Sequence, residues 1–178
     1  MTGNSDDLIP EGVQHRVAFS HVGAIVKGGL HLGSVWLRDT EGMTDENMAI
    51  LQAVSQALTK LKGPWILGGD WNMPPEELMK SGWVDSIEGV IVATKSNTCN
   101  NSVFDYFVVS AKLRHAVRGI QLVNDHAFSP HHPARMYIDG NARRKQARRI
   151  RKPTKIPGIL PHGQPGPDAE FPFTVRHS

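Results

Sequence analysis

The sequence has very little cysteine and no long apolar run. The first shortage excludes disulfide-based and cysteine–zinc folds, and the second argues against a membrane-spanning protein. Cys99 is the single cysteine in 178 residues, which excludes an internal disulfide framework and a cysteine-based zinc site. No stretch approaches the roughly 18 apolar residues of a membrane span. The first residues have neither the basic nor the apolar segment of a signal peptide. We therefore expect an intracellular protein with no membrane partner.

The length and the apolar fraction of 39% are those of one soluble globular domain with a tail. We predict a disordered N-terminus over residues 1–14 and a folded domain over residues 15–139. Residues 140–178 are rich in Arg and Lys and then in Pro and Gly, without apolar periodicity, so we predict a disordered tail there.

Charge is divided unevenly along the chain. Residues 1–134 contain 10 Lys and Arg against 14 Asp and Glu, whereas residues 135–178 contain 10 against 3. An acidic body suits a cation site, and a basic extension suits a polyanion. The simpler alternative is an acidic domain with a solvated basic tail.

The order of predicted elements indicates a mixed α/β fold. Two strands, in His15 to Val26 and Leu30 to Leu37, are separated by Gly28 and Gly29, which predicts a hairpin. An amphipathic helix follows, with Thr44 as a possible cap and apolar residues spaced by three and four up to Gly63. The short apolar run from Trp65 to Gly68 then predicts a buried strand.

The second half of the folded part is predicted to be mostly strands. Pro74 and Pro75 begin a short helical turn. Four further strands are predicted at Gly89 to Thr94, Ser102 to Ser110, Val117 to Val123 and Ala134 to Ile138. This order favours a layered α/β (α+β) sheet with helices on at least one face.

Asp70 and Asn72 follow the buried strand directly, in the segment Gly68-Gly69-Asp70-Trp71-Asn72. Two glycines would let the backbone approach a ligand, a carboxylate can accept a proton or hold a metal, and an amide can donate to a phosphate oxygen. A strand that ends in Gly-Asp is also a common turn, so this pattern alone does not establish a site.

Asp105 and His131 form a second candidate pair. Asp105 lies in an otherwise apolar strand, and a buried carboxylate needs a partner. Histidines precede the last strand, and a carboxylate is the natural group to fix their tautomer. The alternatives are an edge strand on which Asp105 faces water, and a loop in which His126, His131 and His132 are solvated.

Taken together, these motifs resemble the C-terminal half of the endonuclease/exonuclease/phosphatase superfamily, which includes abasic-site and retroelement endonucleases. The order is a strand ending in GDxN, then DYxxVS in a strand, then HxP running into a last strand. The segment from Pro64 to Asn72 looks most like the retroelement-type branch. The resemblance implies part of a layered β-sandwich with flanking helices.

The resemblance also implies roles for individual residues. Asp70 would activate the attacking water and would be the metal-binding residue, while Asn72 would steady the water and the phosphate. His131 would contact the phosphate, and Asp105 would hold His131. The cofactor would be Mg²⁺ or Mn²⁺. Trp36 stands where the family often has a phosphate-contacting tyrosine, and His126 is a second-ranked histidine for the phosphate.

Two departures from the family pattern bear on activity. Proline stands at position 130, where the family has an acid before its histidine. Neither the asparagine strand nor the strand ending in the metal-binding glutamate is found before Arg16. We therefore expect a truncated or weakly active form, whose missing half-sandwich would leave a sheet face open for self-association.

The basic tail is a candidate for nucleic-acid binding or nuclear import. Its charged residues are Arg143, Arg144, Lys145, Arg148, Arg149, Arg151, Lys152 and Lys155. No aromatic residues are interleaved for base stacking, and a solvated linker is the alternative.

Three functions remain open at this point. The first is a metal-dependent phosphodiesterase acting on nucleic acid. The second is a catalytically inactive nucleic-acid-binding or interaction module, and the third is a phosphatase of a small phosphorylated substrate on the same fold.

Overall fold

A computed structural model describes residues 8–23, 25–39, 41–124 and 129–140. The chain divides into two units, Met1–Arg144 and Lys145–Ser178. Every described residue belongs to the first unit, so the fold below is that of the first unit alone.

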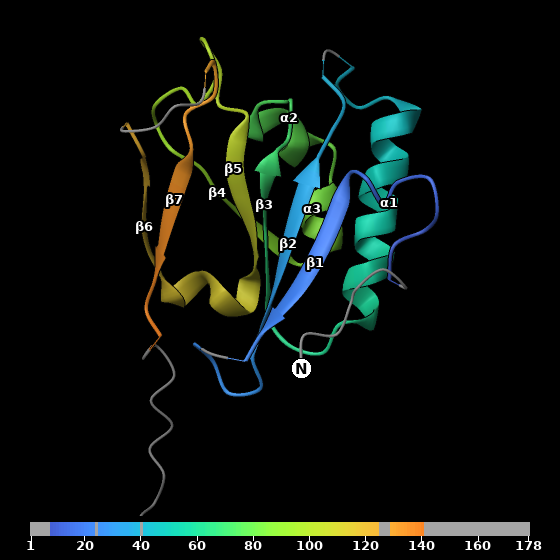
Figure 1. Cartoon of the computed structure of the whole chain (residues 1–178), viewed down its shortest axis with the longest axis vertical. Coiled ribbons are helices and arrows are strands. Elements are labelled where there is room, and N and C mark those ends of the chain that lie inside the picture. The colour runs from blue at the N-terminus through green and yellow to red at the C-terminus, as the bar shows by residue number, and fades with distance from the viewer. Residues whose placement is uncertain (1–7, 24, 40, 125–128, 141–178) are drawn as a thin grey trace, which may run out of the picture. The chain divides into compact units, whose positions relative to one another are not determined.

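A five-stranded mixed sheet is the centre of this unit (Figure 1). In spatial order its strands are β1 (Val17–Val22), β2 (Leu30–Trp36), β3 (Trp65–Asp70), β5 (Asp105–Ser110) and β4 (Gly89–Val92). β2 and β3 are parallel, and the other neighbouring pairs are antiparallel. Parallel strands need a long crossover connection, and this one contains the helix α1 (Asp45–Lys60). The predicted hairpin does join β1 to β2, and both of its glycines have positive φ.

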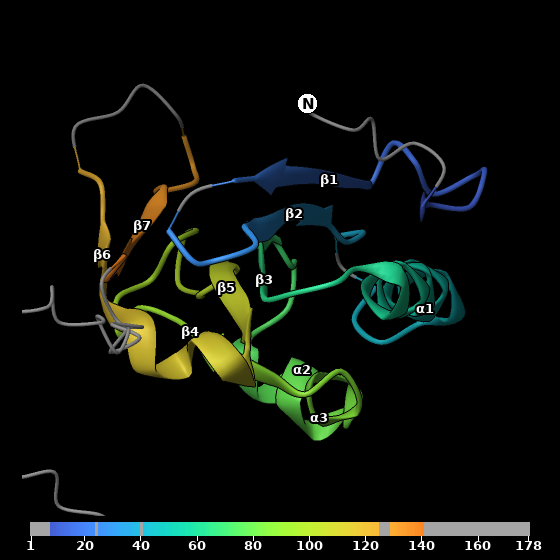
Figure 2. The ribbon, with the colours of Figure 1, turned by 90° about the horizontal axis from the view of Figure 1, so that it is seen from below.

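Helices cover one face of the sheet (Figure 2). Besides α1 they are α2 (Pro75–Lys80) and α3 (Trp83–Ser86). Thr44 occupies the N-cap position of α1, as predicted, but its side chain makes no capping hydrogen bond. Its hydroxyl donates to a carboxylate oxygen of Glu41. The α3 helix was not predicted, since four residues are too few to show a helical period.

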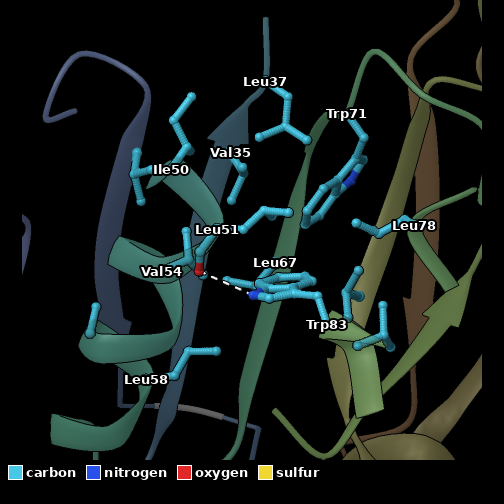
Figure 3. Close-up of a cluster of buried hydrophobic side chains, with 14 of the residues drawn as sticks. Val35, Leu37, Ile50, Leu51, Val54, Leu58, Leu67, Trp71, Leu78 and Trp83 are labelled. Carbon is cyan, nitrogen blue, oxygen red and sulfur yellow. Dashed lines mark hydrogen bonds between the residues drawn. The ribbon is translucent and has the colours of Figure 1, made fainter. Parts of the chain in front are cut away.

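The main core lies between this helical layer and the sheet (Figure 3). Val54 of α1, Leu67 of β3 and Trp71 are fully buried there. The indole N–H of Trp83 donates to the carbonyl oxygen of Leu51 at 3.1 Å, which fastens α3 to α1. This packing fixes the end of β3, from which the candidate site is built.

A smaller cluster lies on the opposite face of the sheet. There the two-stranded sheet of β6 (Val117–Leu122) and β7 (Ala134–Ile138), together with the 3₁₀ helix η2 (Ala111–Ala116), contributes to the apolar contacts. The cover is incomplete, because Leu32 and Trp36 of β2 are 38% and 51% exposed on this face. The self-association predicted for an uncovered face stays a prediction.

The segment before β1 is folded in its described part. Residues 8–14, which the sequence assigned to a disordered terminus, form turns, and Ile9 is buried in the main core. A short apolar pair, Leu8 and Ile9, was too brief a signal to predict this. Among the helices of the described residues, none has the length and hydropathy needed to cross a membrane.

Candidate active site

Three predicted or candidate site residues lie side by side at one end of the sheet. Trp36, the last residue of β2, is paired with Asp70 of β3, and Asp70 is paired with Asp105 of β5. Directly opposed residues on neighbouring strands project to the same face. The carboxyl ends of β2 and β3 and the start of β5 lie together near the top of Figure 1. The pairing therefore brings an indole and two carboxylates to this end of the sheet.

The predicted pairing of Asp105 with His131 is present. Nδ1 of His131 lies 2.9 Å from Oδ2 of Asp105. Nε2 of the same ring lies 3.9 Å from Oδ2 of Asp70, which is beyond hydrogen-bond distance. The ring is thus anchored on one side and faces the Asp70 carboxylate on the other.

Thr98 brings this pair together, and sequence reasoning missed it. Its side chain is fully buried, and its Oγ1 accepts from the backbone N–H groups of Phe104 and Asp105, both at 2.8 Å. The backbone carbonyl oxygen of Thr98 accepts from the N–H of His132. The next residue, Cys99, pairs with His131 in an isolated antiparallel β-bridge of the backbone. A threonine in a polar loop carries no sequence signal for such a role, because the same composition is typical of solvated turns.

The surroundings of His131 stabilise its protonated form. The hydrogen bond from the ring to the Asp105 carboxylate raises the pKa of His131, and the charges of Asp105, Asp70 and Asp39 act in the same direction against the effect of burial. A larger share of imidazolium is therefore present near neutral pH than for a free histidine. The protonated ring has an N–H on the side that faces Asp70.

Asp70 is held in a state that resists ionisation. Burial is the main cause that raises the pKa of its carboxyl, and the nearby Asp105 charge adds to it. The backbone N–H of Asn72, which donates to Oδ1 at 3.2 Å, opposes the shift, as does His131. A carboxylate whose charge is disfavoured is a stronger base and has more to gain from a cation.

Asn72 follows Asp70 by two residues, and its side chain makes a hydrogen bond to the backbone after β2. Its side-chain N–H donates to the carbonyl oxygen of Leu37 at 2.9 Å, and its backbone has a φ of 46°. The residue ties the end of β2 to the turn after β3. Its predicted action on water and phosphate stays a prediction.

Packing between neighbouring strands requires the two glycines before Asp70. A Cβ on Gly69 would stand 1.8 Å from the carbonyl oxygen of Val35, and one on Gly68 would stand 2.8 Å from the ring of Phe107. Both contacts are too short for any side chain. The expectation that they let the backbone approach a ligand stays a prediction beside this packing requirement.

The remaining candidate residues lie outside the described residues. They are His126 and the tail residues Arg143, Arg144, Lys145, Arg148, Arg149, Arg151 and Lys152. Their predicted contacts with phosphate or nucleic acid stay predictions.

A small pocket lies beside the carboxylates. It has a volume of about 210 Å³ and is lined by Gly69, Asp70, Asp105, Tyr106, Phe107, Pro133 and Ala134. A larger hollow of about 690 Å³ lies between the ends of β4 and β6, but Lys95 is its only charged lining residue. Proximity to titratable groups, and not size, places the candidate site at the smaller pocket.

The donor atoms at this site fit a divalent cation. One ligand atom each from Asp70, Asp105 and His131 lie within 4.8 Å of one another, the one such group in the described part of the chain. Two carboxylates suit Mg²⁺ or Mn²⁺. A cation would offset both the burial that mainly raises the pKa of Asp70 and the smaller contribution of the Asp105 charge.

Sequence comparisons give no relative. No protein-family model matches the chain, and no curated protein matches it.

Solved structures do match, at low sequence identity. The endonuclease domain of TRAS1, a telomere-specific non-LTR retrotransposon, aligns over 78% of this chain and 66% of its own, with a TM-score of 0.62 and 12% identity. The 3′ phosphatase NExo from Neisseria, bound to a product DNA hairpin, aligns over 78% and 70%, with a TM-score of 0.53 and 13% identity. The cytolethal distending toxin of Haemophilus ducreyi aligns over 78% and 57%, with a TM-score of 0.55 and 16% identity.

These matches agree in architecture and differ in length. This chain spans 57 to 70% of the length of the three matched chains. Its mixed sheet and flanking helices align with an endonuclease, a phosphatase and a toxin at TM-scores above 0.5. The chain therefore has the fold of the endonuclease/exonuclease/phosphatase superfamily.

Proposed function

We propose that this protein is a metal-dependent phosphodiesterase that acts on nucleic acid. The observation that carries the proposal is the arrangement of Asp70, Asp105 and His131. The imidazole is fixed by one carboxylate at 2.9 Å and faces a second carboxylate across 3.9 Å. A base and a positively charged donor that face each other across a short gap are what attack on a phosphodiester requires.

In this proposal Asp70 accepts the proton of the attacking water as the water oxygen bonds to phosphorus. The P–O bond to the leaving alkoxide breaks, and the alkoxide takes up a proton from solvent. The raised pKa of Asp70 makes it a better base than an exposed aspartate. The protonated ring of His131 donates to a non-bridging phosphate oxygen and stabilises the charge that develops there. Asp105 is a positioning residue, since it holds the imidazole in one orientation and favours its charged form.

A bound Mg²⁺ or Mn²⁺ would neutralise phosphate charge as a Lewis acid. Asp70, with Asp105 beside it, would hold the ion. Because Asp105 is already bonded to His131, only Asp70 is uncommitted to another side chain, and we propose a loosely held ion and low activity. A loosely held ion would stabilise the charge of the transition state less well. The loss of one well-placed electrostatic group typically lowers the rate of the chemical step by about 10² to 10³.

The experiment is plasmid nicking in Mg²⁺ and in Mn²⁺ by the full chain. Asp70→Ala and His131→Ala should each abolish the slow nicking. Asp85→Ala and His115→Ala are matched controls, because both residues are exposed and lie on other elements, α3 and η2. Nicking that survives both site substitutions would refute the assignment.

A second candidate is a nucleic-acid-binding module without catalysis, which the basic run from Arg143 to Lys155 favours. Binding through that run should weaken steeply with added salt. Replacing its Arg and Lys residues by Gln in the full chain should flatten the salt dependence. Salt-sensitive binding without any nicking would favour this candidate, and release of phosphate from a small phosphomonoester would favour a phosphatase. Import into the nucleus stays a prediction of the same run.

A further inference from the structure

Arg16 extends the line of site residues across a fourth strand. The backbone N–H of Trp36 donates to the carbonyl oxygen of Arg16 at 2.9 Å, so the pairing of β1 with β2 continues past Val17. Arg16, Trp36, Asp70 and Asp105 thus form a cross-strand row over β1, β2, β3 and β5. Neighbouring strands are about 4.8 Å apart, so the backbones of Trp36 and Asp70 lie about one strand spacing apart and their side chains project to the same face.

Trp36 differs from every other tryptophan of the chain. Trp65, Trp71 and Trp83 are 7%, 0% and 6% exposed and belong to the core, whereas Trp36 is 51% exposed. The guanidinium carbon of Arg16 lies 4.2 Å from the centroid of the Trp36 ring. One face of the indole is therefore covered by a fixed cation, and the exposed half of its surface is left to solvent.

The geometry points to a binding subsite for an unpaired nucleobase on the Trp36 indole, next to the catalytic groups. This inference rests on the proposed function for the nature of the polymer. Any base can stack on an exposed aromatic ring, and the Arg16 charge beneath the ring suits the phosphates that flank the base. Bases inside a duplex are already stacked, so the preferred ligand is a single strand or a locally unpaired segment.

A second copy of the chain is the rival occupant of this face. Interfaces between copies are apolar at their centre and depleted of charge. Here the exposed Leu32 and Trp36 are separated on their own strand by the exposed polar Ser34, and Arg16 lies under the ring. That composition favours a polyanion with flat rings over an apolar protein surface.

The experiment measures binding by the full chain in EDTA, so that no turnover is needed. The probes are a single-stranded oligothymidylate, an abasic strand of the same length and charge, and the corresponding duplex. The emission of Trp36, the one highly exposed indole, should be quenched by the base-bearing strand and not by the abasic strand. Trp36→Ala should weaken binding of the base-bearing strand by about 5- to 150-fold and leave binding of the abasic strand unchanged.

Two further variants test the chemistry of the ring. Trp36→Phe should keep most of the affinity, because a smaller ring still stacks. Leu32→Ala, on the same face of the same strand, should leave all affinities unchanged. The inference would be overturned if Trp36→Ala weakened binding of the base-bearing and the abasic strand equally, or weakened neither. It would also be overturned if the chain formed a dimer that Trp36→Ala dissociated while the affinity for the base-bearing strand stayed the same. The proposed hydrolysis is tested separately, by comparing plasmid nicking by the parent chain with nicking by Asp70→Ala. Its failure would therefore be distinguishable from failure of the binding subsite.

Discussion

The imidazole of His131 is hydrogen-bonded through Nδ1 to the carboxylate of Asp105 at 2.9 Å, while its Nε2 lies 3.9 Å from the carboxylate of Asp70. The two acids are paired across β3 and β5, yet only one of them is bonded to the ring. In the proposed function this asymmetry gives the two acids different roles, because Asp105 orients the histidine and Asp70 is left for water or a cation.

Asp105→Asn should lower the pKa of His131. The substitution removes the negative charge, including that on the oxygen that accepts from the ring, while a carboxamide of the same shape that can still accept a weaker, neutral hydrogen bond remains. An NMR titration of the His131 ring protons in EDTA measures the shift. His115→Gln is the control and should leave the His131 titration unchanged, and an unaltered pKa in Asp105→Asn would contradict the pairing.

The same pair predicts how stability changes with pH. Because the folded-state pKa of His131 is raised, the stabilisation from its pairing is fully present below the unfolded pKa of about 6.5. It is lost as the pH rises through the folded value. The difference in free energy of unfolding between the parent and Asp105→Asn should therefore be larger at pH 6 than at pH 9, as measured by urea unfolding at both.

Asp70→Asn should stabilise the fold at neutral pH while abolishing nicking. Burial and the Asp105 charge raise the pKa of Asp70, so its ionisation opposes folding. The penalty applies above the folded pKa and is absent below the unfolded value of about 3.9. The melting temperature of Asp70→Asn should thus exceed that of the parent at pH 7, and the two should converge in acid.

Thr98→Val should destabilise the fold by about 1 to 3 kcal/mol, because two backbone N–H groups lose their acceptor. It should also lower the pKa of His131, since Asp105 is no longer held in place. Thr98→Ser keeps the acceptor and should restore both properties. Thr94→Val makes the same chemical change at a threonine whose hydroxyl bond is exposed, and it should stay within about 0.5 kcal/mol of the parent.

Tyr106→Phe should stabilise the fold by about 1 kcal/mol. The Tyr106 hydroxyl is buried and is one of two such side-chain atoms without a hydrogen bond in the described residues, and burial raises its pKa far above the ordinary value. The ring itself stacks on Trp71 and is retained. Tyr137→Phe is the control, since it removes an exposed hydroxyl that accepts from Gln121. Denaturant unfolding at neutral pH compares the variants, and a loss of stability in Tyr106→Phe would show that its hydroxyl is satisfied in solution.

The sequence predicted the parts of the fold that depend on local pattern. The hairpin at Gly28 and Gly29, the helix after Thr44 and the strands around Asp70 and Asp105 follow from period, glycine position and apolar runs. The contact of Asp105 with His131 was predicted from the cost of burying a lone carboxylate, with the family resemblance supplying the partner.

The residues that sequence reasoning missed act through contacts distant along the chain. Thr98 matters because it faces the start of β5 and the segment before β7 at once. Asn47, fully buried within α1, bonds the backbone of Arg38 and Gly42 and so shapes the loop that carries Asp39. Neither role leaves a periodic or compositional trace.

Retention of Gly68 and Gly69 during evolution does not by itself indicate that the Gly-Gly-Asp segment is selected for activity. Each is required by a neighbour, Phe107 or the Val35 backbone, whether or not the protein hydrolyses anything. A copy of this gene that had lost its activity would still be selected to keep both glycines as long as it had to fold. In a library screened for folding alone, glycine should be retained at these two positions, whereas asparagine should be favoured over aspartate at position 70, so retention of Asp70 would be the part of this segment that indicates selection for the proposed activity.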